Sequence, residues 1–248
     1  MKRRLLLIPF LIGVLHLISA CEELYYFTKQ MEPMTQPITQ TEIASGMRES
    51  LVVGAQNAVK DLSAEGGFYN NDLLRIPFPP EAQRMENALR NIGMGSAVDR
   101  FVETLNRSAE VATEKALGIF TSAVRQMTFN DVMEIFIGPE DAATQFLVRT
   151  TSDSLRTAFM PPVRSAIDEV ELTAVWNPLV NAYNQIPFVT EVNPSLEDYI
   201  VQKAMDGLFM SVAREEALIR ENPQARANDL LRRVFGERDR RLEEQEQP

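Results

Sequence analysis

Apolar residues recur at intervals of three and four along nearly the whole chain from residue 41 to residue 236, which is the period of helices that bury one face. Apolar–polar alternation, the pattern of a half-buried strand, does not continue for any length. The sequence therefore predicts an all-α protein, with a single bundle of roughly nine helices over residues 41–236.

Capping residues indicate where several of these helices begin. Thr41, Thr128 and Ser195 each precede a periodic segment, and each can accept a hydrogen bond from a backbone N–H of the first turn. Asp131, three residues after Thr128, can complete a capping box. The longest periodic segment, residues 97–127, is predicted to be one helix, with small residues in its apolar stripe that let another helix approach closely.

Prolines and charge set the remaining boundaries. Pro161 and Pro162 are expected to begin a new helix after one of roughly residues 140–159, because proline is best tolerated in a first turn. A short final helix is predicted over residues 225–235. Residues 237–248 mix both charges without apolar anchors, which predicts a charged tail that is frayed or forms a solvated helix.

One non-helical segment, GGFYNNDLLRIPFPP at residues 66–80, interrupts the helical pattern. Its glycines end a helix, and its prolines force an extended backbone, since a residue before proline avoids the α region. Asn70 and Asn71 are expected to form turns. A functional strap is the alternative, because long irregular loops often carry function. The side chains predicted to fill the bundle interior are Phe68, Ile76 and Phe78.

The N-terminus has the arrangement of an export signal. Lys2, Arg3 and Arg4 are followed by an apolar run, residues 5–18, that is too short to span a bilayer, which takes roughly 20 residues. The sequence LISA then precedes Cys21. This pattern resembles the signal peptide and lipobox of bacterial lipoproteins. The resemblance implies cleavage before Cys21 and acylation of its thiol and of its new amino group.

An ordinary secretory signal cleaved after Ala20 is the alternative, although Ile18 is large for a position that prefers a small residue. A multiply acylated Cys21 would hold the protein stably on a membrane, whereas one acyl chain binds only marginally. Residues 21–40 are predicted to carry the anchor and a flexible spacer. Glu22 is not the aspartate that retains enterobacterial lipoproteins at the inner membrane, so the expected location is the outer membrane, facing the periplasm.

The only histidine and the only cysteine, His16 and Cys21, both lie in this N-terminal region. A processed chain would have no Ser-His-Asp triad, no imidazole base, no free thiolate and no zinc site built from those residues. Glycine-rich nucleotide loops and calcium-loop spacings do not occur in the sequence either. The sequence predicts no cofactor, and it favours a non-enzymatic protein over an enzyme.

Charge narrows the class of partner. Removing the three basic residues of the signal leaves 22 basic residues against 35 acidic ones, a net charge of about −13. Nucleic-acid binding depends on clustered Lys and Arg that neutralise phosphates, so no nucleic acid is expected. The predicted partners are the membrane, through the lipid on Cys21, and an apolar ligand or an envelope protein.

Arg107, Glu110 and Glu114 fall on one face of the long predicted helix. Two carboxylates four residues apart can do acid–base work or hold a metal. The simpler interpretation is an ion pair that locks two helices together. These three residues, with Asn70 and Phe78, are the candidate interaction residues.

Opposite charges alternate at helical spacing in residues 214–233, which predicts a salt-bridged surface. An anion site made by converging arginines is the alternative. The arginines concerned are Arg214, Arg220, Arg226, Arg232 and Arg233.

Several blocks of sequence, in their order, resemble one bacterial family. They are the segment 66–80, residues 106–144 with the turn GPEDAAT, and ARANDLLRRVFG at residues 225–236. The resemblance, from about residue 42 to Gly236, is to the bacterial domain of unknown function family 4197. It implies an α-helical, exported, often lipid-anchored protein of Gram-negative bacteria, and it implies no activity, cofactor or catalytic residue.

Two functions remain as hypotheses. The first is a lipid-anchored envelope protein whose helical domain binds or scaffolds without catalysis. The second is a hydrolase or lyase that works without histidine, through the carboxylates of Glu110 and Glu114.

Replacing the anchor residue tests the N-terminal prediction. Cys21→Ala is expected to leave an uncleaved precursor, because the lipoprotein signal is cut only before a lipidated cysteine. The mass of the purified protein measures this directly, and normal processing of the variant would contradict the prediction.

Overall fold

The computed structural model describes residues 37–169, 172–189 and 195–246. The predicted signal, Cys21 and most of the predicted spacer lie outside the described residues. The chain separates into two units, residues 1–42 and residues 43–248, and the first is described only from residue 37. None of the helices in these ranges is long and apolar enough to cross a membrane.

The all-α prediction is confirmed. In the described ranges the chain forms nine α-helices and two short 3₁₀ helices, η1 and η2, and no strand. The helices are α2 (Gln40–Ser63), η1 (Pro80–Ala82), α3 (Gln83–Asn91), α4 (Gly95–Thr113), α5 (Ala116–Gln126), α6 (Phe129–Ile137), α7 (Ala142–Glu169), α8 (Leu172–Asn184), α9 (Leu196–Glu221), η2 (Pro223–Ala225) and α10 (Asp229–Glu246).

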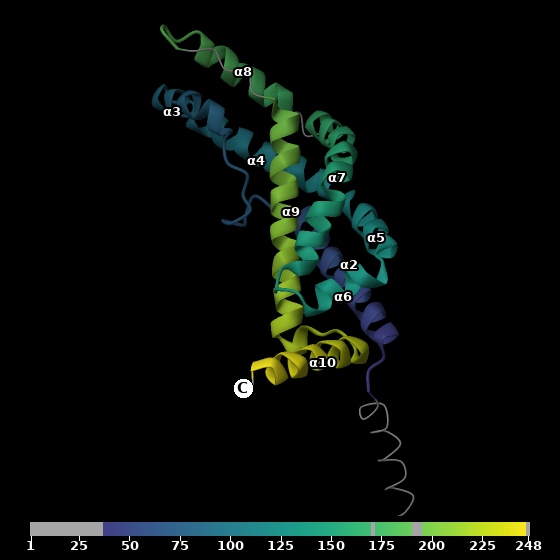
Figure 1. Cartoon of the computed structure of the whole chain (residues 1–248). Helices are drawn as coiled ribbons and strands as arrows, with labels where there is room; N and C mark the ends of the chain where they lie inside the picture. The colour runs from purple at the N-terminus through teal and green to yellow at the C-terminus, as the bar shows by residue number, and fades with distance from the viewer. Residues whose placement is uncertain (1–36, 170–171, 190–194, 247–248) are drawn as a thin grey trace, which may run out of the picture. The chain divides into compact units, whose positions relative to one another are not determined.

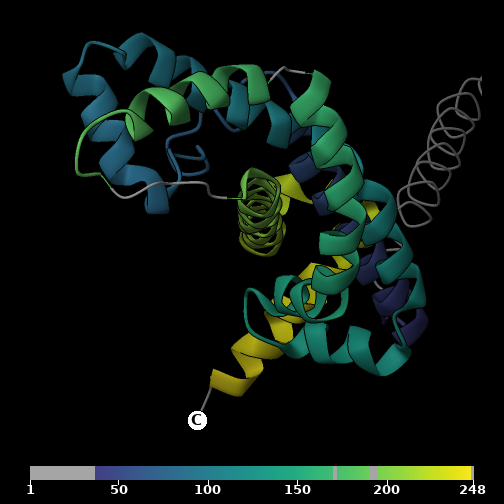
Figure 2. The same cartoon turned by 90° about the horizontal axis from the view of Figure 1, so that it is seen from above.

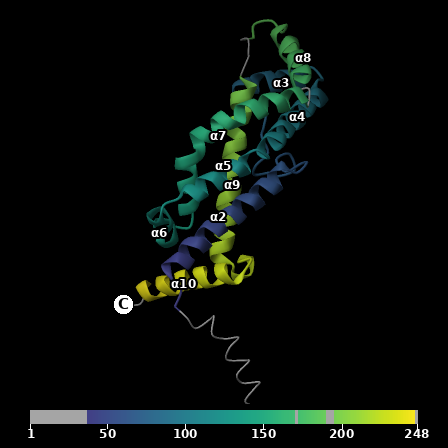
Figure 3. The ribbon, with the colours of Figure 1, turned by 90° about the vertical axis from the view of Figure 1, so that its right-hand side faces the viewer.

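The second unit is built around α9, which packs against α4 and α7. Figure 1 shows α9 as a straight helix, with α10 crossing one of its ends and α3, α4 and α8 gathered towards the other. Figure 2 looks along α9 and shows the other helices arranged around it. Figure 3 shows α2 crossing α9 obliquely, with α6 to the left of α9. The pairing of α9 with α7 is the most extensive helix contact of this unit.

Two of the three predicted helix caps are confirmed. Thr128 and Asp131 form the capping box of α6, and the Ser195 hydroxyl accepts a hydrogen bond from the backbone N–H of Asp198 at the start of α9. The third, Thr41, is wrong, because α2 begins at Gln40. The side chain of Thr39 accepts from the N–H of Glu42, whose carboxylate accepts from the N–H of Thr39. In a capping box the acidic residue stands three positions after the capping residue, and Glu42 stands three positions after Thr39.

The prediction of one helix over residues 97–127 is wrong. The apolar stripe does continue through this segment, since Ala112 and Ala116 are both buried, but α4 ends at Thr113 and α5 begins at Ala116. The Thr113 hydroxyl donates to the carbonyl oxygen of Ala109, 2.7 Å away. Such bonds to the preceding turn compete with the helix ladder and bend helices.

The predicted break at Pro161 and Pro162 is also wrong, because α7 continues through both prolines. A proline inside a helix leaves the carbonyl four residues earlier without a donor. Those carbonyls belong to Thr157 and Ala158, which are exposed, so that water can hydrate them. Packing holds the helix together across this point through a buried face made of Leu155, Phe159, Val163 and Ile167.

The final helix differs from the prediction at both ends. It begins at Asp229 and extends to Glu246, through most of the segment expected to be a tail. Arg238 is buried, and its guanidinium donates to the carbonyl oxygens of Phe136 and Gly138 at the end of α6. The buried Arg238 therefore fixes this part of α10 to α6, although the segment lacks the apolar residues that usually do so.

Glu216, on α9, is a buried carboxylate that holds three helices together. It accepts hydrogen bonds from the backbone N–H groups of Ala143 and Thr144, in the first turn of α7, at 3.0 and 2.8 Å. It also pairs with the buried guanidinium of Arg220, which donates to the carbonyl oxygen of Ile135 in α6. The first N–H groups of a helix lack intrahelical partners, and here a distant helix supplies the acceptor.

The predicted salt-bridged surface is therefore wrong for part of residues 214–233. Arg220 and Arg226 are buried, and Arg226 donates to the carbonyl oxygens of Ile219 and Arg220 at the end of α9. Burial, helped by the nearby charge of Arg220, lowers the pKa of the Arg238 guanidinium below its ordinary value. These arginines bind helix C-termini, where the carbonyl groups lack donors and cations are favoured.

We expect Glu216→Gln to lower the free energy of unfolding by about 3 kcal/mol, because it leaves the buried Arg220 without its carboxylate. Glu221→Gln, at an exposed position near the end of the same helix, is the control, and it should change the value by no more than about 0.5 kcal/mol. Urea unfolding of the purified proteins measures both. Equal effects of the two substitutions would contradict this account of the junction.

Candidate functional site

The strap, residues 64–79 between α2 and η1, is the longest non-helical segment within the described ranges. Gly66 has a φ of 81°, which favours glycine, and it turns the chain out of α2. The strap then folds on itself through backbone bonds from Asn70 to Gly66 and from Arg75 to Asn71. It is an ordered loop of turns, as its asparagines predicted.

Glu110 fastens the first part of the strap to α4. Its side chain is buried, and its Oε1 accepts hydrogen bonds from the backbone N–H groups of Phe68 and Tyr69, at 3.2 and 3.4 Å. Its other oxygen, Oε2, accepts from the Arg107 guanidinium at 3.2 Å. The ion pair between Arg107 and Glu110 therefore lies within α4, where Glu110 also holds the strap. It does not join two helices, as the simpler interpretation of the sequence had predicted.

Asn106, one turn before Glu110, fastens the second part of the strap. Its Oδ1 accepts from the backbone N–H of Ile76, and its Nδ2 donates to the carbonyl oxygen of the same residue, both at 2.8 Å. The side chain is fully buried. Burying a backbone segment requires partners for its polar groups, and α4 supplies them for the strap.

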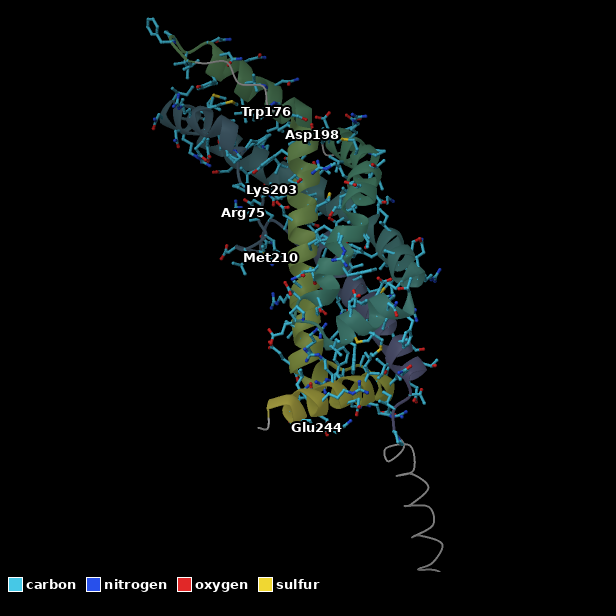
Figure 4. The ribbon with its side chains drawn as sticks, viewed as in Figure 1. Arg75, Trp176, Asp198, Lys203, Met210 and Glu244 are labelled. Atoms are coloured by element: carbon cyan, nitrogen blue, oxygen red, sulfur yellow. The ribbon has the colours of Figure 1, made fainter. Side chains whose placement is uncertain are left out.

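The strap also lies against α9. A Cβ atom at Gly207 would stand 2.6 Å from Cε1 of Phe68, so this position needs glycine for Phe68 to approach α9 so closely. The Tyr199 hydroxyl donates to the carbonyl oxygen of Pro77 at 3.1 Å. In Figure 4, Arg75 of the strap lies beside α9, between the levels of Lys203 and Met210.

The apolar side chains of the strap enter the core, as predicted for Phe68, Ile76 and Phe78, which are all buried. The Phe78 ring centroid lies 5.0 Å from that of Phe101 and 5.8 Å from that of Trp176. Three aromatic rings from the strap, α4 and α8 therefore pack together at ordinary aromatic distances.

A polar hollow of about 420 Å³ lies on the α4 side of the strap. It is lined by Glu65, Gly66, Tyr69, Asn70, Glu103, Thr104, Arg107 and Glu110. Asn70 is exposed there, and Arg107 is partly exposed. Both oxygens of Glu110 already accept hydrogen bonds, so this carboxylate anchors backbone and is not presented to the hollow as a free base.

The candidate residues thus have different environments. Three of them, Asn70, Arg107 and Glu110, meet at the polar hollow. Glu114 is exposed and does not line the hollow, and Phe78 lies in the core. Across the described ranges, no three acidic residues are grouped in a way that could hold a metal ion.

A second depression lies on the other side of the strap, and we call it the apolar groove. Its volume is about 430 Å³, and its walls come from α2, the strap and α9. Its lining includes Asp61 and Leu62 of α2, Leu73 of the strap, and Met210, Arg214 and Leu218 of α9.

The apolar groove is bordered by large apolar side chains that are open to solvent. Leu73 is 81% exposed, Met210 52% and Leu218 40%. None of these three residues was among the candidates predicted from the sequence. Two features of the sequence could have indicated their exposure. Leu73 stands beside turn-forming residues, and the apolar residues at positions 210 and 218 lie outside the core-facing stripe of α9.

A family model described as "Protein of unknown function (DUF4197)" matches residues 37–236, and the chain therefore belongs to this family. The resemblance inferred from the sequence blocks is thereby confirmed. Comparison with curated proteins finds no match, and comparison with solved structures finds none either.

The anchoring of the strap can be tested at Glu110. We expect Glu110→Ala to lower the free energy of unfolding by roughly 2–4 kcal/mol, because the buried N–H of Phe68 and the partly buried N–H of Tyr69 lose their acceptor. The amides of Phe68 and Tyr69 should exchange hydrogen much faster, while that of Ile76, held by Asn106, stays protected.

The matched control is Glu114→Ala, one turn later on the exposed face, which should change stability by no more than about 0.5 kcal/mol. Hydrogen exchange followed by mass spectrometry measures the local effect. Unchanged exchange at residues 68 and 69 in the Glu110 variant would contradict the assignment.

Proposed function

We propose that this member of the DUF4197 family is a lipid-anchored protein of the bacterial cell envelope whose helical domain binds a partner without catalysing a reaction. The observation that carries the binding role is the apolar groove, with its exposed Leu73, Met210 and Leu218. The pattern before Cys21 supports the anchor, and Glu22 supports an outer-membrane location facing the periplasm.

The exposed groove residues favour binding for an energetic reason. Burying a leucine or methionine side chain is worth roughly 1.5–3 kcal/mol, and three of them border one hollow. Contiguous apolar surface with a polar rim commonly marks an interaction site, whereas single exposed apolar residues need no explanation. The same residues would be a liability on a protein that binds nothing.

The construction of the strap supports the same role. A wall that is fixed by Glu110 and Asn106 does not have to be ordered when a partner arrives. Ordering side chains and loops costs free energy in every association, so a wall that is already ordered makes the binding free energy more favourable. The groove therefore has the preorganisation expected of a binding surface.

The carboxylate pair predicted for the hydrolase, Glu110 and Glu114, is not brought together in one cavity. A catalytic pair would need two carboxylates facing one substrate, but Glu110 binds backbone and Glu114 is exposed outside the polar hollow. The carboxylates of Glu65 and Glu103 also line the polar hollow, beside an Arg107 that already pairs with Glu110. We therefore place the interaction at the apolar groove.

Site-specific photocrosslinking of the full-length protein in its native cells tests the binding role. A benzophenone amino acid in place of Leu73 is expected to form a discrete adduct, because an occupied groove holds a partner within reach. The same amino acid in place of Ile137 is the control, since Ile137 is 65% exposed but does not line the apolar groove.

Adducts of equal yield at both positions, or none at position 73, would contradict partner binding at the groove. A parallel experiment tests the anchor, because wild-type protein should fractionate with outer membranes while Cys21→Ala should not carry the lipid. Recovery of the wild-type protein free of membranes would contradict the anchor and leave the groove untouched.

A further inference from the structure

We infer that the apolar groove takes an amphipathic α-helix of another protein, oriented with a basic side chain towards Asp61 and an acidic side chain towards Arg214. This inference rests on the proposed function, because it names the chemistry of the partner that the same groove binds. It is carried by two opposite charges that face the groove from different walls.

Asp61 and Arg214 are both available to a partner. Asp61 is exposed on α2, and Arg214 is exposed on α9. Neither side chain has an ion pair or a hydrogen bond with any part of the chain that the structure describes. The third charged side chain that lines the groove, Glu215, already accepts a hydrogen bond from Asn57 of α2.

The two charges border surface that a partner would cover. Arg214 stands four residues after Met210 and four before Leu218, so the three share one stripe of α9. A partner that covers this stripe removes water from the guanidinium, and burying a charge without a counter-charge is unfavourable. The occupant must therefore supply an acidic group beside α9 and a basic group beside α2.

The dimensions of the groove suit a helix. The nine residues of α9 from Met210 to Leu218 extend over about 12 Å, which is slightly more than two turns. The volume of about 430 Å³ lies in the range of binding sites, and helices dock in such grooves through apolar residues at positions i, i+4 and i+7. An acid and a base flanking that stripe would set the direction of the bound helix.

Other occupants satisfy these groups less well. A lipid or fatty acid has one anionic head that could pair with Arg214, but its chain would press hydrocarbon against the Asp61 carboxylate. A second copy that paired through the same face would bring one hollow against another, and two facing hollows leave a void that close packing avoids. A convex helix with both charges fills the space and pairs both side chains.

The experiment uses the full-length protein in its native cells, with the benzophenone amino acid at Met210 and charge reversals at the two walls. Since Asp61 and Arg214 make no contact that a described residue needs, Asp61→Lys and Arg214→Glu should fold as the wild type does. Each reversal is expected to lower the adduct yield about tenfold. Arg232→Glu, which changes an exposed arginine of α10 outside the groove, should leave the yield unchanged.

Mass spectrometry of the adduct identifies the crosslinked peptide. The expected result is a peptide from a different protein, within an amphipathic helix that has an acid and a base on opposite flanks of its apolar stripe. Reversing that helix's acidic residue should restore the yield with Arg214→Glu.

An adduct with lipid, with a second copy of this chain or with an extended segment overturns the helix inference and leaves partner binding at the groove standing. A helical adduct whose yield is unaffected by both reversals also overturns it. Absence of any adduct at Leu73 overturns the proposed function as well.

Discussion

The fold depends on one physical requirement, which is that helix ends and loop backbone buried inside an all-α protein must find hydrogen-bond partners elsewhere. Glu216 meets it most fully, because one carboxylate serves the first N–H groups of α7 and the guanidinium of Arg220. Arg220 and Arg238 then take carbonyl groups at the end of α6. Buried charges of this kind add little net stability compared with apolar side chains, but a missing partner is severely destabilising, so they specify which helix ends meet.

The strap follows the same rule at a second place. Asn106 and Glu110 give its backbone the partners that a sheet or helix would otherwise provide, and this lets an irregular segment lie inside the protein. With its backbone held on α4 and Phe68 pressed on Gly207, the strap exposes Leu73 on one side and Asn70 on the other. The structural task of Glu110 and the exposure of the apolar groove are thus parts of one arrangement.

The sequence predicted what depends on neighbours along the chain. The helical period, the capping box of Thr128 and Asp131, and the burial of Phe68 and Phe78 all follow from local spacing or from apolar character, and all are present. It did not predict what depends on distant partners. Glu110 meets a residue 42 positions away and Glu216 one 73 positions away, and no local pattern carries that information. The apolar groove could not be predicted from the sequence for the same reason. Its walls include Asp61, Leu73 and Met210, which only the packing of α2, the strap and α9 brings together.

The energetics of the strap decide how the groove would work. Releasing it would expose Phe68, at roughly 1.5–3 kcal/mol, and break the bonds to Asn106 and Glu110, at about 1 kcal/mol each. Because these two side chains make four such bonds, the total of roughly 6 kcal/mol corresponds to a released fraction on the order of one in 10⁴. The strap is therefore not a cover that opens for a ligand. Since the groove is formed before any partner arrives, association would be governed by how well the partner's apolar stripe and its two charges match Leu73, Asp61 and Arg214, and most changes in affinity should appear in the dissociation rate.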